Sequence, residues 1–153
     1  MARYWRIAQQ RFALDRSCEG SRLHGGRWNK AGFGALYAST SVELATLEKL
    51  VHTSGLTPRD LLLVAVDVPD DDGLTQVAPL YELPKAWNAL PGSDEAQAYG
   101  TRWLRQAQQL VLLLPSVIVP EARNALINPL HPRFGEVSMA VTRPFDFDPR
   151  MFR

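Results

Sequence analysis

The spacing of apolar and polar residues divides this chain into short segments, which predicts a mixture of strands and helices. Strands are expected at residues 4–8, 36–38, 60–68, 110–114 and 137–142, with 117–119 also extended. Each segment is short and either apolar or alternating in polarity, as strands are. Eleven prolines and ten glycines separate the segments, so the pattern favours an α+β domain over a helical bundle or a doubly wound sheet.

Two helices are predicted among these strands. Thr40 is expected to cap the first, with Glu43 completing a capping box, and the helix is expected to run to about His52. Gly55 followed by Pro58 is a typical stop signal. The second helix is expected at residues 94–109.

Glu48 lies at the edge of the apolar face of the first predicted helix, one residue after Leu47 and four after Leu44. A carboxylate at this position can point into a cleft. A solvated helical glutamate is the ordinary alternative.

Residues 15–34 are rich in Gly, Arg and Ser, which predicts a long surface loop of the kind that often carries function. Within it, two glycines precede Arg27, so the backbone could approach a ligand while the planar guanidinium binds phosphate. The alternative is a solvated Arg27 beside a Trp28 that anchors the core.

Three further residues are candidates for binding. Tyr37 could stack on a planar base, although a core tyrosine is more common. Ser116 lies between two apolar segments and could bind a ligand or the backbone. Asn124 opens a stretch to Pro132 in which Asn-Pro and His-Pro favour a structural turn.

Composition excludes several classes of protein. A net charge of +1 argues against a chain that mainly coats nucleic acid or an anionic membrane. No apolar run approaches the roughly 20 residues that span a bilayer, and no signal peptide is recognisable, so we expect a cytoplasmic protein. The single cysteine, Cys18, is expected to be an unremarkable thiol, the three histidines lack metal-ligand spacing, and the acidic run 70–72 is expected to be an exposed turn.

Taken in order, these motifs resemble the RES domain family, named for its Arg, Glu and Ser. The match comprises Gly-Gly-Arg27-Trp-Asn, Tyr37-Ala-Ser, Leu-Glu48, Pro-Ser116, and Asn124 with the stretch from Asn128 to Phe134. The C-terminal segment from Phe145 to Phe152 is also similar, so the resemblance covers nearly the whole chain, and we expect a single RES domain over residues 1–153.

The resemblance implies a fold similar to that of ADP-ribosyltransferases: a split, mostly antiparallel β-core with flanking helices around an NAD cleft. It also implies the toxin of a type II toxin–antitoxin pair, which arrests growth by cleaving the nicotinamide–ribose bond of NAD+ through hydrolysis or phosphorolysis. The alternative is an ADP-ribosyltransferase that modifies a specific cellular protein. NAD+ is then a substrate, with no cofactor and no metal required.

The resemblance also suggests roles for the candidate residues. Glu48 is expected to stabilise the positive charge that develops on the ribose, and Arg27 to hold the pyrophosphate or ribose. Tyr37 is expected to stack against nicotinamide. Ser116 is expected to bond to the ribose or nicotinamide, and Asn124 to hold the cleft or the nucleotide.

Two expectations concern the acceptor and the partner. Some ADP-ribosyltransferases carry a Glu-x-Glu pair, but positions 46 and 50 are Thr and Leu here, which favours NAD+ breakdown over protein modification. Ser39-Thr40-Ser41 is similar to a Ser-Thr-Ser motif of that superfamily and is interpreted as a helix cap. The expected partner is an Xre-type helix-turn-helix antitoxin in a hetero-oligomer that blocks the cleft near Arg27, with DNA binding left to the antitoxin.

Overall fold

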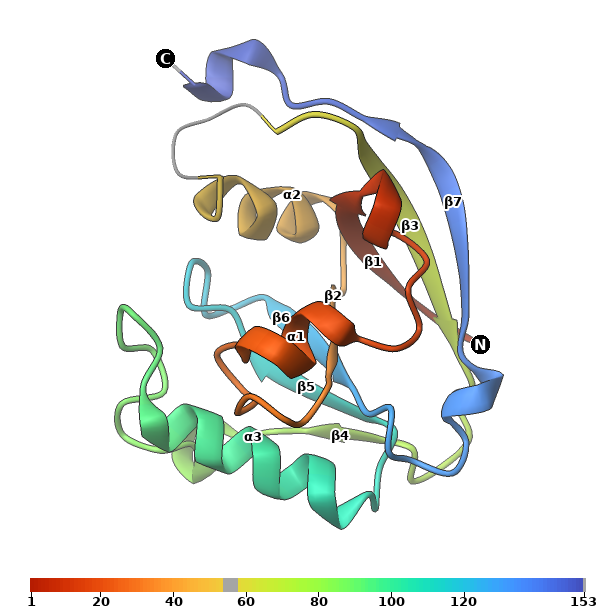
Figure 1. The fold of residues 1–153 in the computed structure, drawn as a ribbon. Helices are drawn as coiled ribbons and strands as arrows, with labels where there is room; N and C mark the ends of the chain where they lie inside the picture. The colour runs from red at the N-terminus through yellow and green to blue at the C-terminus, as the bar shows by residue number, and fades with distance from the viewer. Residues whose placement is uncertain (54–57, 153) are drawn as a thin grey trace.

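A seven-stranded sheet, in the order β4-β5-β6-β2-β1-β3-β7, forms the centre of the computed structural model, which describes residues 1–53 and 58–152 (Figure 1). The strands are β1 (Ala2–Gln9), β2 (Leu36–Ser39), β3 (Leu61–Val68), β4 (Thr75–Val77), β5 (Val111–Pro115), β6 (Arg123–Ile127) and β7 (Ser138–Phe145). The α-helices are α1 (Glu19–His24), α2 (Val42–Val51) and α3 (Asp94–Gln106). Short 3₁₀ turns lie at Gln10–Phe12, Leu80–Glu82, Phe134–Glu136 and Pro149–Phe152.

The sheet is nearly divided between β2 and β1. These two strands share the single register pair Trp5–Ser39, whereas β1 pairs with β3 along its whole length. We call the Trp5–Ser39 junction the seam; α2 lies against both β1 and β2 there (Figure 1). Every neighbouring pair of strands is antiparallel except β4–β5, so the expected split, mostly antiparallel α+β core is confirmed.

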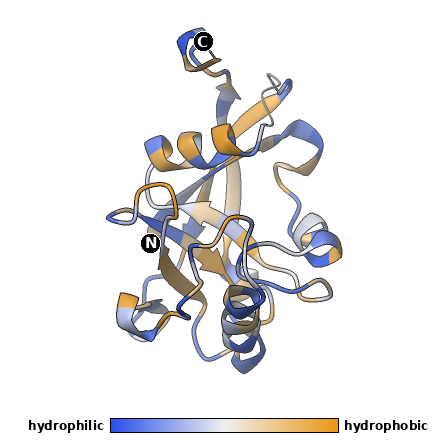
Figure 2. Cartoon of the chain, turned by 90° about the vertical axis from the view of Figure 1, so that its left-hand side faces the viewer, coloured by the Kyte–Doolittle hydropathy of each residue, from blue (hydrophilic) through white to orange (hydrophobic). Residues whose placement is uncertain are grey.

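Both faces of the β5–β6 pair are buried, because the side chains alternate between two apolar clusters. One face packs under α3 and the Trp28 segment through Leu112, Leu114 and Leu126. The other packs against β1 and β3 through Val111, Ala125 and Ile127. Figure 2 shows hydrophobic residues concentrated in the strands, whereas α3 is mostly hydrophilic. This helix buries only one stripe, including Ala96, Trp103 and Leu104.

The long loop expected at residues 15–34 is wrong in part. Helix α1 forms within it, and both Trp28 and Asn29 are buried. The Asn29 side-chain amide explains this order, since its Nδ2 donates to the carbonyls of Ser21 and Phe33, at 2.8 and 2.7 Å. The buried Asn29 side chain thus holds together two parts of a glycine-rich segment.

Three other local expectations are also wrong. Ser41, rather than Thr40, caps α2 by accepting the Leu44 amide. Residues 117–119 bend instead of extending, because the Ser116 hydroxyl accepts two backbone amides of that segment. The turn expected over residues 124–132 forms only after β6, where the His131 amide donates to the Asn128 carbonyl at 3.1 Å, and Asn124 itself lies in β6. Strand β4 was not anticipated. The stop signal proposed for α2 includes Gly55, which lies outside the described residues.

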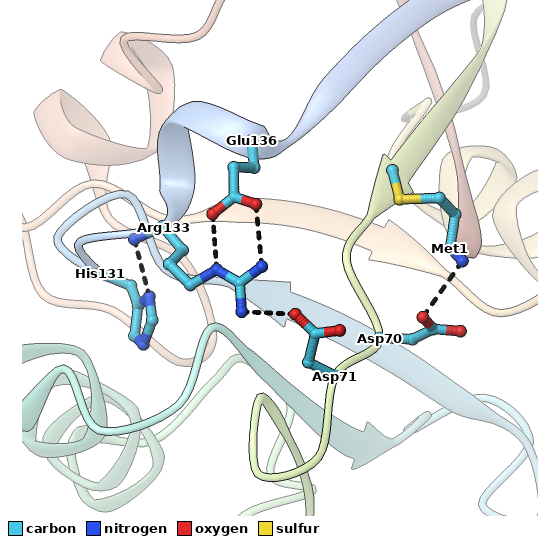
Figure 3. A network of polar contacts seen from close by, with 6 residues as sticks. All are labelled: Met1, Asp70, Asp71, His131, Arg133 and Glu136. Atoms are coloured by element: carbon cyan, nitrogen blue, oxygen red, sulfur yellow. Dashed lines mark hydrogen bonds and ion pairs between the residues drawn. The ribbon is translucent and has the colours of Figure 1, made fainter.

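The acidic turn after β3 is exposed, as expected, and its carboxylates bind cations of the chain itself (Figure 3). Arg133 bonds to Glu136 through Nε and NH2, at 2.5 and 2.8 Å, and reaches Asp71 at 2.7 Å. The terminal amine of Met1 pairs with Asp70 at 3.1 Å. These exposed pairs add little to stability, but they link the segment before β7 to the turn between β3 and β4.

We predict that Gly100→Ala destabilises the protein strongly. A Cβ at Gly100 in α3 would lie 1.9 Å from the Trp28 carbonyl oxygen, so α3 and the Trp28 segment would have to separate. Urea unfolding should show a loss of about 3 kcal/mol. The control is Gly20→Ala in α1, where nothing lies within 4 Å of the added Cβ; it should be neutral or stabilise by up to about 1 kcal/mol. Equal effects of both substitutions would contradict the close approach of α3.

Candidate active site

The carboxylate of Glu48 meets two polar side chains, that of Asn124 in β6 and that of Ser116, which directly follows β5. Ser116 Oγ donates to Glu48 Oε1 at 2.8 Å, and Asn124 Nδ2 donates to the same oxygen at 2.7 Å. No hydrogen bond from the described residues reaches Oε2. Glu48 is half-buried. It is therefore a fixed carboxylate in which Oε1 accepts two hydrogen bonds and Oε2 accepts none from the described residues.

Strand register explains why these residues meet. Asn124 in β6 pairs with Ser39 on one side and with Leu114 in β5 on the other. Residues paired across strands point to the same face, and so do residues two positions apart in one strand. Ser39, Asn124 and Leu114 therefore share a face. Ser116 follows the end of β5, and the bond from its amide to the Ala122 carbonyl at 2.9 Å keeps it beside that face, where α2 brings Glu48.

The Ser116 hydroxyl uses its full hydrogen-bonding capacity within the protein. It donates to Glu48 and accepts the amides of Ile118 and Val119, at 3.1 and 3.2 Å. A hydroxyl has one donor and two acceptor positions. A bond from Ser116 to the ribose or nicotinamide would therefore have to replace one of these three.

Arg27 is anchored through one of its guanidinium nitrogens. NH1 donates to the carbonyls of Trp87 and Ala89, at 3.0 and 2.8 Å. Partial burial lowers the pKa of Arg27, and the nearby Glu48 charge acts in the opposite direction. A guanidinium has five N–H donors, so the three on Nε and NH2 are not used by these two bonds. The Arg27 cation and the Glu48 anion thus lie near enough for their charges to interact.

Tyr37 organises the segment that carries Arg27. Its hydroxyl donates to Asn29 Oδ1 at 2.5 Å and accepts the Trp28 amide at 3.1 Å. Burial raises the pKa of Tyr37 well above its usual range, so the hydroxyl stays protonated. The absence of a side chain at Gly26 is required here, since a Cβ would lie 2.7 Å from that hydroxyl. Stacking of the Tyr37 ring on nicotinamide remains a prediction.

Two residues of this site, Ser39 and Asn29, stand in the quoted motifs, but the sequence assigned neither of them a role here. Ser39 donates to Asn124 Oδ1 at 2.7 Å, so the Ser-Thr-Ser stretch is divided: Ser39 bonds within the sheet and only Ser41 caps the helix. Asn29 is fully buried and links Tyr37 to the loop. The alternation of residues along β2 could have placed Ser39 on the same face as Tyr37, but its pairing with Asn124 could be found only if β6 had been recognised.

Other candidate chemistry is weak in the described part of the chain. No group of three His, Cys, Asp or Glu side chains suited to a metal ion occurs among residues 1–53 and 58–152. Cys18 is buried, and burial raises its pKa to about 11, which disfavours a thiolate nucleophile. Within the same ranges, no helix is long and apolar enough to cross a membrane.

Two surface hollows lie away from Glu48. One, of about 300 Å³, is lined by Val77, Leu80, Pro115 and Arg123 among others, and another, of about 510 Å³, by Gln9 to Arg11 with Arg59 and Asp60. Pro115 and Arg123 are paired across β5 and β6, so they point to the face opposite Asn124. The convergence of polar groups on Glu48, not the size of a hollow, identifies the candidate site.

Comparison with known proteins gives a consistent result. The profile of the RES domain matches residues 3–148. "Prs ADP-ribosylating toxin" of Sphingobium sp. (strain YBL2) is 40% identical, covering 98% of this chain and 96% of that protein. "Toxin Res" of Yersinia enterocolitica serotype O:8 is 35% identical, covering 96% of this chain and 97% of that protein.

The fold also matches a solved structure. That structure is the Mycobacterium tuberculosis MbcT–MbcA toxin–antitoxin complex, matched with a TM-score of 0.68 over 98% of this chain and 86% of that chain. Sequence identity is 18%, so this likeness concerns the fold.

We predict that Tyr37→Phe loosens the Arg27 segment. The change leaves the Trp28 amide and Asn29 Oδ1 without their hydroxyl partner in a buried setting, which should lower the free energy of unfolding by about 1–3 kcal/mol. Tyr81→Phe is the matched control, because Tyr81 is 87% exposed, and its effect should stay within about 0.5 kcal/mol. Chemical denaturation measures both, and a Tyr37→Phe variant as stable as the control would refute the anchoring role.

Proposed function

The chain belongs to the RES domain family, and from this premise we propose that it is the toxin of a toxin–antitoxin pair that cleaves the nicotinamide–ribose bond of NAD+. The observation that carries the proposal is the Glu48 carboxylate, held by Ser116 and Asn124 through one oxygen. The charge of Glu48 opposes the lowering of the Arg27 pKa by burial, so the two groups are near one another. The names of the relatives support the toxin assignment.

The chemistry of this bond suits a fixed carboxylate. Departure of nicotinamide develops positive charge on the ribose, as in glycoside hydrolysis. A negative group that is already in position stabilises that charge as it forms, without reorganisation. Glu48 Oε2 is the oxygen that would face the ribose, because Oε1 already accepts two hydrogen bonds. Ser116 and Asn124 would act mainly by holding Glu48, and Asn124 keeps one N–H for the nucleotide.

Arg27 would bind the pyrophosphate or the ribose through the donors that do not bond to Trp87 and Ala89. Tyr37 would present its ring to nicotinamide while its hydroxyl holds the segment before it. NAD+ is the substrate in this proposal, and no metal or cofactor takes part.

The acceptor of the ADP-ribosyl group distinguishes two reactions. Water or inorganic phosphate gives breakdown of NAD+, which is the first proposal. A protein side chain gives an ADP-ribosyltransferase, and the name of the 40% identical relative, an ADP-ribosylating toxin, favours this second candidate. Both reactions require the same bond cleavage at Glu48.

The proposed partner is an Xre-type helix-turn-helix antitoxin that covers the site near Arg27 in a hetero-oligomer. The toxin–antitoxin complex with a similar fold supports an antitoxin partner, and its Xre type is part of the proposal. DNA binding would belong to the antitoxin, in keeping with the net charge of +1. Tight binding of operator DNA by the isolated chain at physiological salt would contradict this division.

The proposal is tested by a mass balance. Antitoxin-free protein is incubated with NAD+ that is labelled in its adenylate part, with and without inorganic phosphate. Nicotinamide and all ADP-ribosyl products are followed. We expect nicotinamide release without labelled protein, and a phosphate ester of ADP-ribose only when phosphate is present if the reaction is phosphorolysis. Label on added cellular protein would select the transferase. Folded protein that releases no nicotinamide under any of these conditions would overturn the proposal.

Glu48→Gln is expected to lower the rate of nicotinamide release by roughly 10²–10³, because the amide removes the charge but keeps the shape of the side chain. Glu43→Gln is the matched control, since Glu43 lies on the same helix and is exposed. Circular dichroism and unfolding midpoints verify that both variants fold. Full activity of Glu48→Gln would remove Glu48 from the mechanism.

A further inference from the structure

Ser39 is the last residue of β2 and lies at the seam of the sheet. Its side chain is buried, with 4% exposure, and its backbone pairs with both Trp5 and Asn124. The hydroxyl donates to Asn124 Oδ1 at 2.7 Å, and Asn124 Nδ2 donates to Glu48 Oε1 at 2.7 Å. A continuous chain of hydrogen bonds therefore runs from the centre of the sheet to the candidate catalytic carboxylate.

Which end of the Asn124 amide meets Glu48 in this series of hydrogen bonds depends on how the amide is oriented. The amide offers an acceptor at one end and donors at the other. With the Ser39 hydroxyl on Oδ1, the NH2 group points to Glu48. The opposite orientation would place Oδ1 against a carboxylate oxygen, which repels it. Ser39 gives the acceptor end a partner in a buried setting, where an unpaired carbonyl would be costly.

The bond from Ser39 to Asn124 also affects which oxygen of Glu48 is available to a substrate. Ser116 and Asn124 both bind Oε1, and together they fix the rotation of the carboxylate. If the Asn124 amide turned or withdrew, Ser116 alone would hold Glu48, and the carboxylate could rotate about that single bond. Ser39 thus influences where Oε2 points without touching it.

We propose that Ser39 is a positioning residue that acts through Asn124 to fix the reactive oxygen of Glu48. The inference rests on the proposed function, because the reaction it serves is cleavage of the nicotinamide–ribose bond. Ser39 touches neither that bond nor Glu48.

The first test compares kcat and KM in three variants. Ser39→Ala should lower kcat about 10-fold and change KM for NAD+ by less than about 2-fold, since the reacting geometry is lost and not the binding surface. Ser39→Thr keeps the hydroxyl and should recover most of kcat. Thr40→Val is the matched control and should leave kcat unchanged. The exposed Thr40 hydroxyl donates to the Arg123 carbonyl, and within residues 1–53 and 58–152 it makes no other hydrogen bond.

A double-mutant cycle tests the route through Asn124. In an Asn124→Leu background, which removes the amide at similar volume, Ser39→Ala should cause no further loss of kcat. Equal loss in both backgrounds would show that Ser39 acts independently of Asn124. Loss of stability in Ser39→Ala with unchanged kcat would reduce Ser39 to a packing role. Either result overturns the proposal.

A measurement without substrate separates this inference from the proposed function. The side-chain amide of Asn124 should give protected ¹H–¹⁵N resonances in the native protein and in Thr40→Val, and Ser39→Ala should lose that protection. An inactive wild-type protein with this pattern would refute the NAD+ proposal but keep the positioning of Asn124 by Ser39. Protection that persists in Ser39→Ala would refute the positioning role, whatever the activity.

Discussion

Two hydrogen bonds to one oxygen of Glu48 connect helix α2 with strand β6 and with the residue that follows β5. Bonds of this kind, from neutral donors to a charged acceptor, are worth about 1.5–3 kcal/mol each, and they are stronger in a partly buried setting. They are made where β1 and β2 share only one register pair, so the sheet itself holds its two halves together weakly at that point. The Glu48 carboxylate thus fixes α2 across the seam and, in the same contact, fixes its own orientation.

Residues of the short strand β2 anchor both charged residues of the site, Arg27 and Glu48. Tyr37 holds the segment that presents Arg27, and Ser39 holds the amide that binds Glu48. These residues are two positions apart in β2, so they share a face and their Cα atoms lie about 7 Å apart. Strand β2 lies between β6 and β1 in the middle of the sheet. A central strand therefore positions both the Arg27 cation and the Glu48 anion, while the charged side chains themselves come from a loop and a helix.

Local patterns predicted part of this arrangement. The apolar runs that became β3 and β5, the helix that carries Glu48 and the exposed acidic turn were all recognisable, because each is encoded within a few consecutive residues. The pairing of β6 with β2 and β5 was not, since the Asn-Pro and His-Pro signals just beyond Ile127 suggested a turn. That error hid Ser39, whose role depends on a residue 85 positions away. The ordered structure of residues 15–34 was missed for a similar reason. Hydrogen bonds of the single buried Asn29 order this segment, and they leave no apolar periodicity for sequence patterns to detect.

Because Glu48 lies on a helix, a glutamate two residues before it would not share its face, so the Glu-x-Glu pair has a different significance here. In an extended segment, residues two apart share a face, but on a helix they are about 200° apart. Thr46 therefore points away from Glu48, and its hydroxyl bonds to the Val42 carbonyl of the same helix. The lack of a glutamate at position 46 thus says little about the acceptor. The helix neighbours that do share the side of Glu48, three or four residues away, are Leu44, Ala45, Val51 and His52, none of them acidic. In the proposed reaction, helix α2 would supply one carboxylate whether water, phosphate or protein accepts the ADP-ribosyl group. The choice between these acceptors would then lie with groups that approach the ribose from outside α2.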